Sequence, residues 1–392
     1  MVSGILGMTL LTYMVVAQSE HVSSVRSQSW HKALVMAEAG VEEALAKMNG
    51  AGVSGPAGSG SGGPSFGPLH REFDGGAYDV RVDAAAGAGA TIYATGYVAI
   101  PALSSTVSRA IVVATTNGPL FTTAVAAQTN LTMSSHGSGL TFSDSFDSGN
   151  PQLGNRTNGE VACLAGSVNL GSSKIAGNLL LGSTVTSNSG QVEGSVFHDL
   201  NLELPDVVVP SPYWVPAAAT NQIIDGTTYR YVFNKWNSGD YLVNAPGSIY
   251  VGPDAKVKLQ VISSGFSAPS VYLAGTDWHA SSLVIYALGA GFSLGDATVE
   301  SGKASRLVYL GLPGNTSLTL NDNTTFTGTI YAPAADFTNN VVKGKNKKAS
   351  FTGSCIAKSV RINGTAAFHF DEDLLRNSPM TRGFVITSWK EL

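Results

Sequence analysis

The sequence predicts a mainly β protein with one long N-terminal α-helix, then a small antiparallel sheet, then a parallel β-solenoid (a coil of short stacked strands, or β-helix). Three observations support this fold class: an uncharged apolar run at the N-terminus, three alternating runs at hairpin spacing, and a repeat of roughly 20–25 residues further on. Charged residues make up only 13% of the 392 residues, which suits stacked β-structure with tight polar corners. The net charge is −4, without the excess of Lys and Arg that is typical of nucleic-acid binding, so no nucleic-acid partner is expected.

The chain divides into five predicted segments. They are a helix over residues 1–50, a Gly/Ser-rich linker over 51–67, a small antiparallel sheet over 68–118, a solenoid over 119–375, and a C-terminal strand or tail over 376–392. A Pro-rich stretch near 197–247 breaks the solenoid pattern. We interpret it as an excursion from the stack that contains a hairpin within residues 227–243.

The first part of the predicted helix is apolar on all sides. No acidic or basic residue precedes Glu20, and residues 5–17 are interrupted only by Gly7, Thr9 and Thr12. A membrane-spanning helix needs about 20 apolar residues, so this run is borderline short. It has no basic start and no cleavage pattern, so we predict a retained helix rather than a signal peptide. The side chains predicted to serve polymerisation or membrane insertion are Ile5, Leu6, Met8, Leu10, Leu11, Tyr13, Met14, Val15 and Val16.

The second part of the same helix carries a single apolar stripe. The stripe has spacings of three and four residues and is formed by Leu34, Ala37, Val41, Ala44 and Met48. Glu43 and Lys47 form a favourable i,i+4 pair away from the stripe. Asn49-Gly50 supplies a stop signal. We therefore expect one long helix with a second half that packs against a folded domain.

The run AEAGVEEALAKMN at residues 37–49 resembles the N-terminal region of pilin-like proteins of the type IV filament superfamily, most closely the PilX-type minor pilins. GMTLLTYMVV at 7–16 is similar to the segment after a prepilin cleavage glycine, although Thr12 stands where most pilins carry Glu. The resemblance implies that the small sheet packs on the second half of the helix. It also implies self or related pilin-like subunits as partners, the inner membrane before assembly, and a cell-surface location.

A repeat in the second half of the chain predicts the solenoid. FTGTIYAPAADFT at 326–338 is echoed by FTGSCIAKSVRIN at 351–363, and similar phrases precede both. Stacking such turns about 4.8 Å apart pairs their backbones and aligns like side chains into ladders. The predicted ladder is formed by Tyr250, Tyr272, Tyr286, Tyr309, Tyr331 and Ile356. A β-sandwich with chance similarity is the alternative.

The two cysteines test whether the stack is continuous. Cys163 and Cys355 occupy matching places in their repeats but lie about eight rungs apart by sequence, nearly 40 Å at the inter-rung spacing. A disulfide needs Cα atoms within about 7 Å, so both thiols are expected to stay free in a continuous stack. A bridge between them would mean that the stack is interrupted.

The sequence offers little chemistry. The histidines do not cluster at metal spacing, no catalytic motif is present, and we expect no catalytic residue, cofactor or resident metal. Asp144 and Asp147, together with the acidic residues 371–373, are candidate Ca²⁺ ligands, but solvated turns and Asx-type corners are the preferred interpretation. The segment AAFHFDEDLL at 366–375 is expected to cap the solenoid.

These observations favour a non-enzymatic structural subunit of a pilus-like filament or its tip, which displays a solenoid for adhesion, with surface glycans as further partners. One alternative is a membrane-anchored adhesin or glycan-binding protein that never polymerises. A second is a polysaccharide-active β-helix enzyme, which would need carboxylates converging on one groove.

Overall fold

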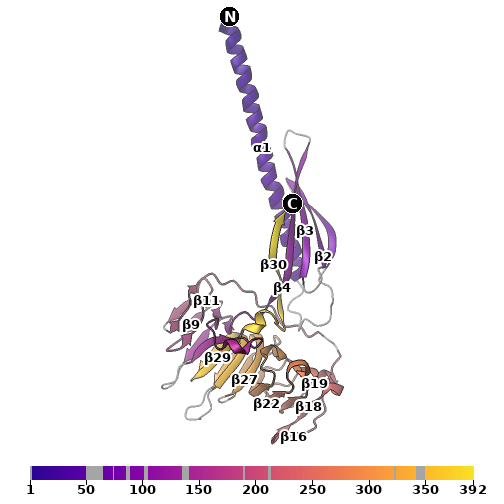
Figure 1. Cartoon of the computed structure of the whole chain (residues 1–392), viewed down its shortest axis with the longest axis vertical. Helices are drawn as coiled ribbons and strands as arrows, with labels where there is room; N and C mark the ends of the chain where they lie inside the picture. Colours follow the sequence, from indigo (N-terminus) through magenta and orange to yellow (C-terminus); the bar gives the residue numbers. More distant parts are fainter. Residues whose placement is uncertain are drawn as a thin grey trace. The chain divides into compact units, whose positions relative to one another are not determined.

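The computed structural model describes residues 2–49, 65–73, 75–84, 89–100, 105–134, 141–188, 190–210, 213–321, 324–340 and 349–392. The chain forms two compact units. The first is built from residues near both ends of the chain, up to Gly118 and from Arg382 onward, and the second from residues 119–381. Figure 1 shows the helix and the two sets of strands that make up these units.

The first unit consists of one helix and one sheet. Its elements are α1 (Val2–Asn49), β1 (Phe66–Phe73), β2 (Gly76–Ala84), β3 (Gly89–Ala99), β4 (Thr106–Pro119) and β30 (Thr381–Glu391). The sheet order is β1-β2-β3-β4-β30, and the pairs from β1 to β4 are antiparallel. The sequence predicted three of these strands. It missed β1, whose first residues were assigned to the linker, and it placed the C-terminal strand at the end of the solenoid instead of beside β4.

The apolar stripe of α1 packs on this sheet. Ala37, Val41, Ala44 and Met48 are buried in one cluster with inward side chains of β2, β3 and β4, and Leu34 lies partly buried at its edge. The helix approaches β3 closely at Gly96, where an added Cβ would lie 2.1 Å from the carbonyl oxygen of Ala33. A glycine on the strand opposite small helix residues therefore sets the distance between the two backbones.

The second unit is a stack of short strands. In chain order these are β5 (Val125–Ala127), β6 (Leu131–Ser134), β7 (Phe142–Phe146), β8 (Val161–Cys163), β9 (Ser167–Asn169), β10 (Lys174–Ile175), β11 (Leu179–Leu181), β12 (Thr186–Asn188), β13 (Gln191–Val192), β14 (Val196–Phe197), β15 (Val215–Pro216), β16 (Gln222–Ile224), β17 (Thr227–Tyr229), β18 (Tyr231–Phe233), β19 (Gly239–Val243), β20 (Ile249–Val251), β21 (Lys256–Val261), β22 (Phe266–Leu273), β23 (Ser282–Ala287), β24 (Gly291–Val299), β25 (Leu307–Gly311), β26 (Ser317–Leu320), β27 (Thr325–Asn340), β28 (Ala349–Asn363) and β29 (Ala366–Asp371). Short 3₁₀ turns occur at η1 (Pro151–Leu153), η2 (Lys235–Asn237), η3 (Asp277–His279), η4 (Ala304–Arg306) and η5 (Glu372–Leu375).

Successive rungs of this stack pair in parallel, as a β-helix requires. For example, β21 pairs with β23, β23 with β25, and β27 with β28 over nearly their whole lengths. The hairpin of β16 and β17 is antiparallel. The predicted fold class is thus confirmed: a mainly β chain with one long helix, a small antiparallel sheet and a large parallel sheet.

The order of rungs in space differs from their order in the sequence. The chain enters the stack in its middle at β5 and β6, runs to one end at β14, and begins again at the other end near β15 and β18. It then returns rung by rung until β28 pairs with β27 on one side and with β5 and β6 on the other. In Figure 1, β9 and β11 lie at one end of the unit, β18 and β19 at the other, and β27 and β29 between them.

This order corrects the expected separation of the cysteines. Cys355 pairs with Val125, and the strand of Val125 pairs in turn with that of Cys163, so a single rung lies between the two cysteine rungs. The predicted separation of about eight rungs is wrong because it assumed that rungs stack in sequence order. Both thiols are nevertheless free and buried.

The Pro-rich region is only partly an excursion. Residues 198–210 and 213–214, here called the crossing segment, lie between the last strand at one end of the stack and the first strand at the other. β18 and β19 belong to a regular rung and pair in parallel with β20 and β21. The predicted hairpin over 227–243 is therefore wrong, and the hairpin of this region is β16–β17. The crossing segment covers one outer face of the stack: Tyr331 donates to the carbonyl oxygen of Pro205 at 2.6 Å, and Trp214 packs edge-on against Tyr286.

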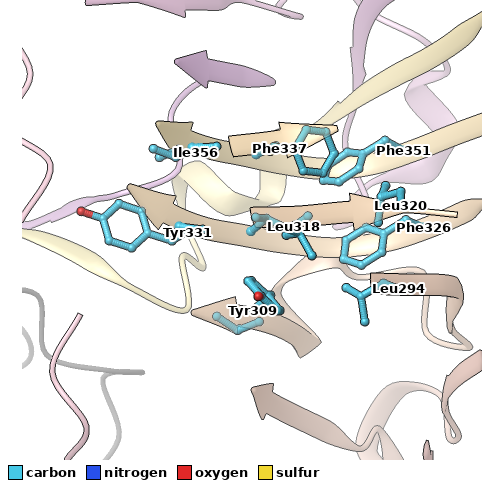
Figure 2. Close-up of a cluster of buried hydrophobic side chains, with 14 of the residues drawn as sticks. Leu294, Tyr309, Leu318, Leu320, Phe326, Tyr331, Phe337, Phe351 and Ile356 are labelled. Carbon is cyan, nitrogen blue, oxygen red and sulfur yellow. The ribbon is translucent and has the colours of Figure 1, made fainter. Parts of the chain in front are cut away.

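The predicted aromatic ladder separates into three columns. Tyr286, Leu310, Tyr331 and Ile356 follow one another in register on the face under the crossing segment. Tyr309 pairs with Ile285 and Ile330 in the neighbouring, inward column, so its inclusion in the ladder was wrong: an offset of one residue reverses the face of a strand. Figure 2 shows Tyr309 and Tyr331 on adjacent rungs of this cluster.

The other two tyrosines stack elsewhere. Tyr250 on β20 and Tyr272 on β22 pair directly with each other, and their parallel ring centroids are 5.6 Å apart. The interior holds a different ladder, in which Phe326, Phe351 and Phe368 stack with centroid distances of 4.9 and 5.1 Å. The sequence did not predict it. Figure 2 shows the first two of these rings one above the other.

The segment expected to cap the solenoid lies inside it. β29 pairs with β28 on one side and with β7 on the other. The cap was predicted because the segment is the last repeat in the sequence, and this prediction is wrong because the last repeat is a middle rung in space.

Candidate functional site

The most distinctive surface of the first unit is the front part of α1, residues 6–17, here called the front segment. Its large apolar side chains are at least half exposed: Leu6, Met8, Leu10, Leu11, Tyr13, Met14, Val15 and Val16 range from 50% to 77%. The side chain of Ile5, predicted to belong to this set, lies outside the described residues. Exposed apolar surface of this extent is typical of an interaction site.

The two threonine hydroxyls of the front segment turn back onto the helix. Thr9 donates to the carbonyl oxygen of Leu6 at 3.0 Å, and Thr12 donates to that of Met8 at 2.8 Å. The segment therefore presents methyl groups rather than hydroxyls at these positions. Among the residues that the structure describes, no helix combines the length and the apolar character needed to cross a membrane.

The rear part of α1 is anchored to the sheet by a polar cluster. The carboxylate of Glu43 accepts hydrogen bonds from the guanidinium of Arg71, at 2.8 Å from Nη2, and from the hydroxyl of Tyr78, and it forms an ion pair with Lys47 at 3.2 Å. The hydrogen bonds from Arg71 and Tyr78 outweigh burial and lower the pKa of Glu43 from 4.5 to about 2. Burial, aided by the Glu43 carboxylate, raises the pKa of Tyr78 to about 12.

The acidic residues singled out in the sequence meet in the second unit, where β29 joins β7. Asp144, Asp147, Asp371, Glu372 and Asp373 are each at most 9% exposed, so the interpretation as solvated turns is wrong. Each carboxylate has protein partners. The shortest contacts are those of Asp144 with His369 at 2.5 Å, of Glu372 with Arg156 at 2.6 Å, and of Asp147 with Arg376 at 2.6 Å.

The Asx-type part of that interpretation agrees with the structure. Asp371 accepts from the backbone amide of Asp373 and also from both the amide and the hydroxyl of Ser148. Burial raises the pKa of Asp371 despite these hydrogen bonds. For Asp147, burial works to raise the pKa, but the hydrogen bond from Arg376 and the amide of Gly149 lower it overall.

The candidate Ca²⁺ ligands are held by protein partners rather than gathered as free ligands. Within the described parts of the chain, no group of three or more His, Cys, Asp or Glu side chains is placed to hold a metal ion. Asp144 and Asp147 are instead engaged by His369 and Arg376, from segments that lie far away in the sequence. The network joins β7, which comes early in the chain, to its spatial neighbour β29, which comes last in the stack's sequence.

The side chains of Cys163 and Cys355 are also buried in the second unit. Burial raises the pKa of Cys163 to about 11 and raises that of Cys355 further. Both thiols are therefore protonated and unreactive near neutral pH.

Comparisons with known proteins cover parts of this architecture. A family model described as a domain of unknown function (DUF7305) matches residues 239–377, the returning half of the stack. No curated protein matches the chain. Among solved structures, the competence-associated pilin ComZ from Thermus thermophilus is similar at 12% identity and a TM-score of 0.29, over 92% of this chain and 96% of that one. A glycosylated ice-binding protein from an Arctic yeast is similar at 14% identity and a TM-score of 0.26, over 64% of this chain and 90% of that one. Both TM-scores are too low to support an inference about this chain.

Proposed function

We propose that this chain is a non-enzymatic structural subunit of an extracellular filament, in which the front segments of many copies pack together and the β-solenoid is displayed outward. The observation that carries the proposal is the exposure of the front segment on a helix whose rear apolar stripe is buried by its own sheet. The resemblance of residues 37–49 to pilin-like proteins agrees with it.

The partner that would best cover the front segment is the same segment of other copies of this chain. Its apolar side chains are exposed on all sides, so a partner that covers one face would leave the others in water. A bundle of like helices surrounds each member and buries every face. The absence of acidic and basic residues before Glu20 removes charge repulsion between copies in such a bundle.

Electron microscopy of the full chain after removal of detergent tests the proposal. We expect filaments for the wild type and for Val35→Asp, because Val35 is 56% exposed on the same helix but lies behind the front segment. The double variant Leu10→Asp/Leu11→Asp should remain as single particles with an unchanged circular dichroism spectrum. Single particles from the wild type, or filaments from the double variant, would contradict polymerisation and favour a singly anchored protein.

A further inference from the structure

Two tryptophans of the second unit are almost fully exposed at the same corner of the stack. Trp236 is 86% exposed in the loop between β18 and β19, and Trp278 is 95% exposed in the loop between β22 and β23. The loop of Pro253 and Asp254 lies between them in the rung order. We call the three stacked loops, residues 234–238, 252–255 and 274–281, the tryptophan corner.

The loops of the tryptophan corner are tied to one another. The amide of Gly252 donates to Phe233 at 2.7 Å, and the amide of Asp254 donates to the carbonyl oxygen of His279 at 2.9 Å. The outer loops leave strands that are two rung steps apart, because β18 pairs with β20 and β20 with β22, and each step is about 4.8 Å. The corner therefore carries two exposed indoles on loops that are two rungs apart.

Each tryptophan is held on a pre-organised turn. In the first loop, the side chain of Asn234 accepts from the amide of Trp236 at 2.9 Å, and the side chain of Asn237 caps the amide of Asn234 in return. In the second, both carboxylate oxygens of Asp254 lie 3.1 Å from Nδ1 of His279, the neighbour of Trp278. Water solvates a large apolar ring poorly, so covering the ring is favourable. Because each turn is already ordered, binding costs little conformational entropy.

The chemistry of the corner fits an extended neutral glycan. An indole face carries negative π density that attracts the electropositive C–H face of a pyranose ring. Between the platforms lie polar groups for hydroxyls: Asp254 is 37% exposed and His279 is 74% exposed. Tryptophans of protein-binding hot spots sit in well-packed pockets, whereas these two rings stand almost fully exposed on protruding loops. One lysine, Lys235, stands against Asp254 and Asp277, so the corner has a formal net charge of −1 with His279 neutral, which does not favour an anionic ligand.

We infer that the tryptophan corner binds an extended, neutral, equatorially linked polysaccharide, with one sugar ring on Trp236 and another on Trp278. The inference deepens the proposed display function and rests on it for the ligand's place outside the filament. The stacked pair of Tyr250 and Tyr272 differs from this site because its rings cover each other. At Trp236 the ring is approached by a flexible lysine instead, with Nζ of Lys235 4.8 Å from the ring centroid.

Calorimetric titration of the full chain with cellohexaose, chitohexaose and maltohexaose tests the site. We expect at least one of the two extended hexasaccharides to bind and the curved maltohexaose to bind more weakly. Trp236→Ala and Trp278→Ala should each weaken binding roughly ten-fold or more, and Trp278→Phe should retain most of it. The matched control is Trp389→Ala, since Trp389 is also exposed, at 46%, but lies on β30.

Several results would overturn the inference. These are no binding of either extended hexasaccharide, equal binding of maltohexaose, or unchanged binding by the double variant Trp236→Ala/Trp278→Ala with a native circular dichroism spectrum. The Leu10→Asp/Leu11→Asp chain separates the two proposals. If it binds glycan while the wild type forms no filaments, only polymerisation is wrong; if filaments form and no glycan binds, only the glycan site is wrong.

Discussion

The front and rear parts of α1 belong to one unbroken helix of 48 residues, yet their surroundings are opposite. In the rear, Ala37, Val41 and Ala44 are at most 2% exposed because the sheet of the same chain covers them. In the front, side chains of greater apolar area are at least half exposed. The rear part is therefore covered by its own subunit, whereas the front part exposes apolar surface that the described residues of the subunit leave uncovered.

Gly96→Val is expected to have the largest effect, because it should disrupt the packing of the rear part of α1 on β3. An added Cβ would overlap the carbonyl oxygen of Ala33 and lie 2.6 Å from the amide nitrogen of Ala37, both backbone atoms that cannot move alone. We expect the free energy of unfolding of the first unit to fall by about 3 kcal/mol or more. Faster hydrogen exchange across β2–β4 would report it, with Thr95→Val on the other face of β3 as the control. Unchanged exchange in the glycine variant would show that the helix does not pack on β3 at this distance.

A smaller effect is expected from Glu43→Gln. The neutral amide loses the charge that strengthens the hydrogen bonds from Arg71 and Tyr78, which should cost about 1 kcal/mol at pH 7. Because folding lowers the pKa of Glu43 from 4.5 to about 2, its stabilising contribution is fully present above pH 4.5 and is lost as the pH falls toward 2.

Thermal unfolding between pH 6 and pH 2 measures this dependence. The wild type should lose more stability than Glu43→Gln over the acidic part of the range, so that the two curves converge near pH 2. Parallel curves would mean that the Glu43 cluster does not anchor the helix.

The smallest effect on the subunit is expected from Leu11→Ala. The side chain is 69% exposed and buries little area within its own chain, so the free energy of unfolding should change by less than about 0.5 kcal/mol. Ala44→Asp, a change on the same helix at a buried position, is the contrasting variant and should destabilise the first unit strongly. A large loss of stability from Leu11→Ala would show that the front segment has a partner within the subunit.

Local patterns predicted the buried stripe of the helix, three strands of the small sheet and the repeat of the stack. The spacing of Leu34 to Met48 identified the buried stripe because helix periodicity is a property of the segment itself. The echo of residues 326–338 in 351–363 identified a real pair of neighbouring rungs, since these residues pair almost one to one in β27 and β28. The fold class followed from such local signals.

Relations between distant segments could not be predicted in the same way. Nothing in the repeat says that β28 stacks on β5, so the order of rungs, the cysteine separation and the position of β29 were all misjudged. The assignment of Tyr309 failed for a related reason: a count of residues between tyrosines does not fix the register, and one residue reverses the face. The tryptophan corner carried a usable signal, because tryptophans in turn sequences between predicted strands are expected to be exposed.

The stacking order also governs when the second unit becomes complete during synthesis. Its central layer joins residues such as Thr123 and Ser354, which are 231 positions apart in the chain. At about 5–20 residues per second, the early rungs wait roughly 10–50 s for the neighbour that covers them. Until then their open edge must be kept from foreign strands, and a chain shortened from its C-terminal side loses its middle layer before it loses either end.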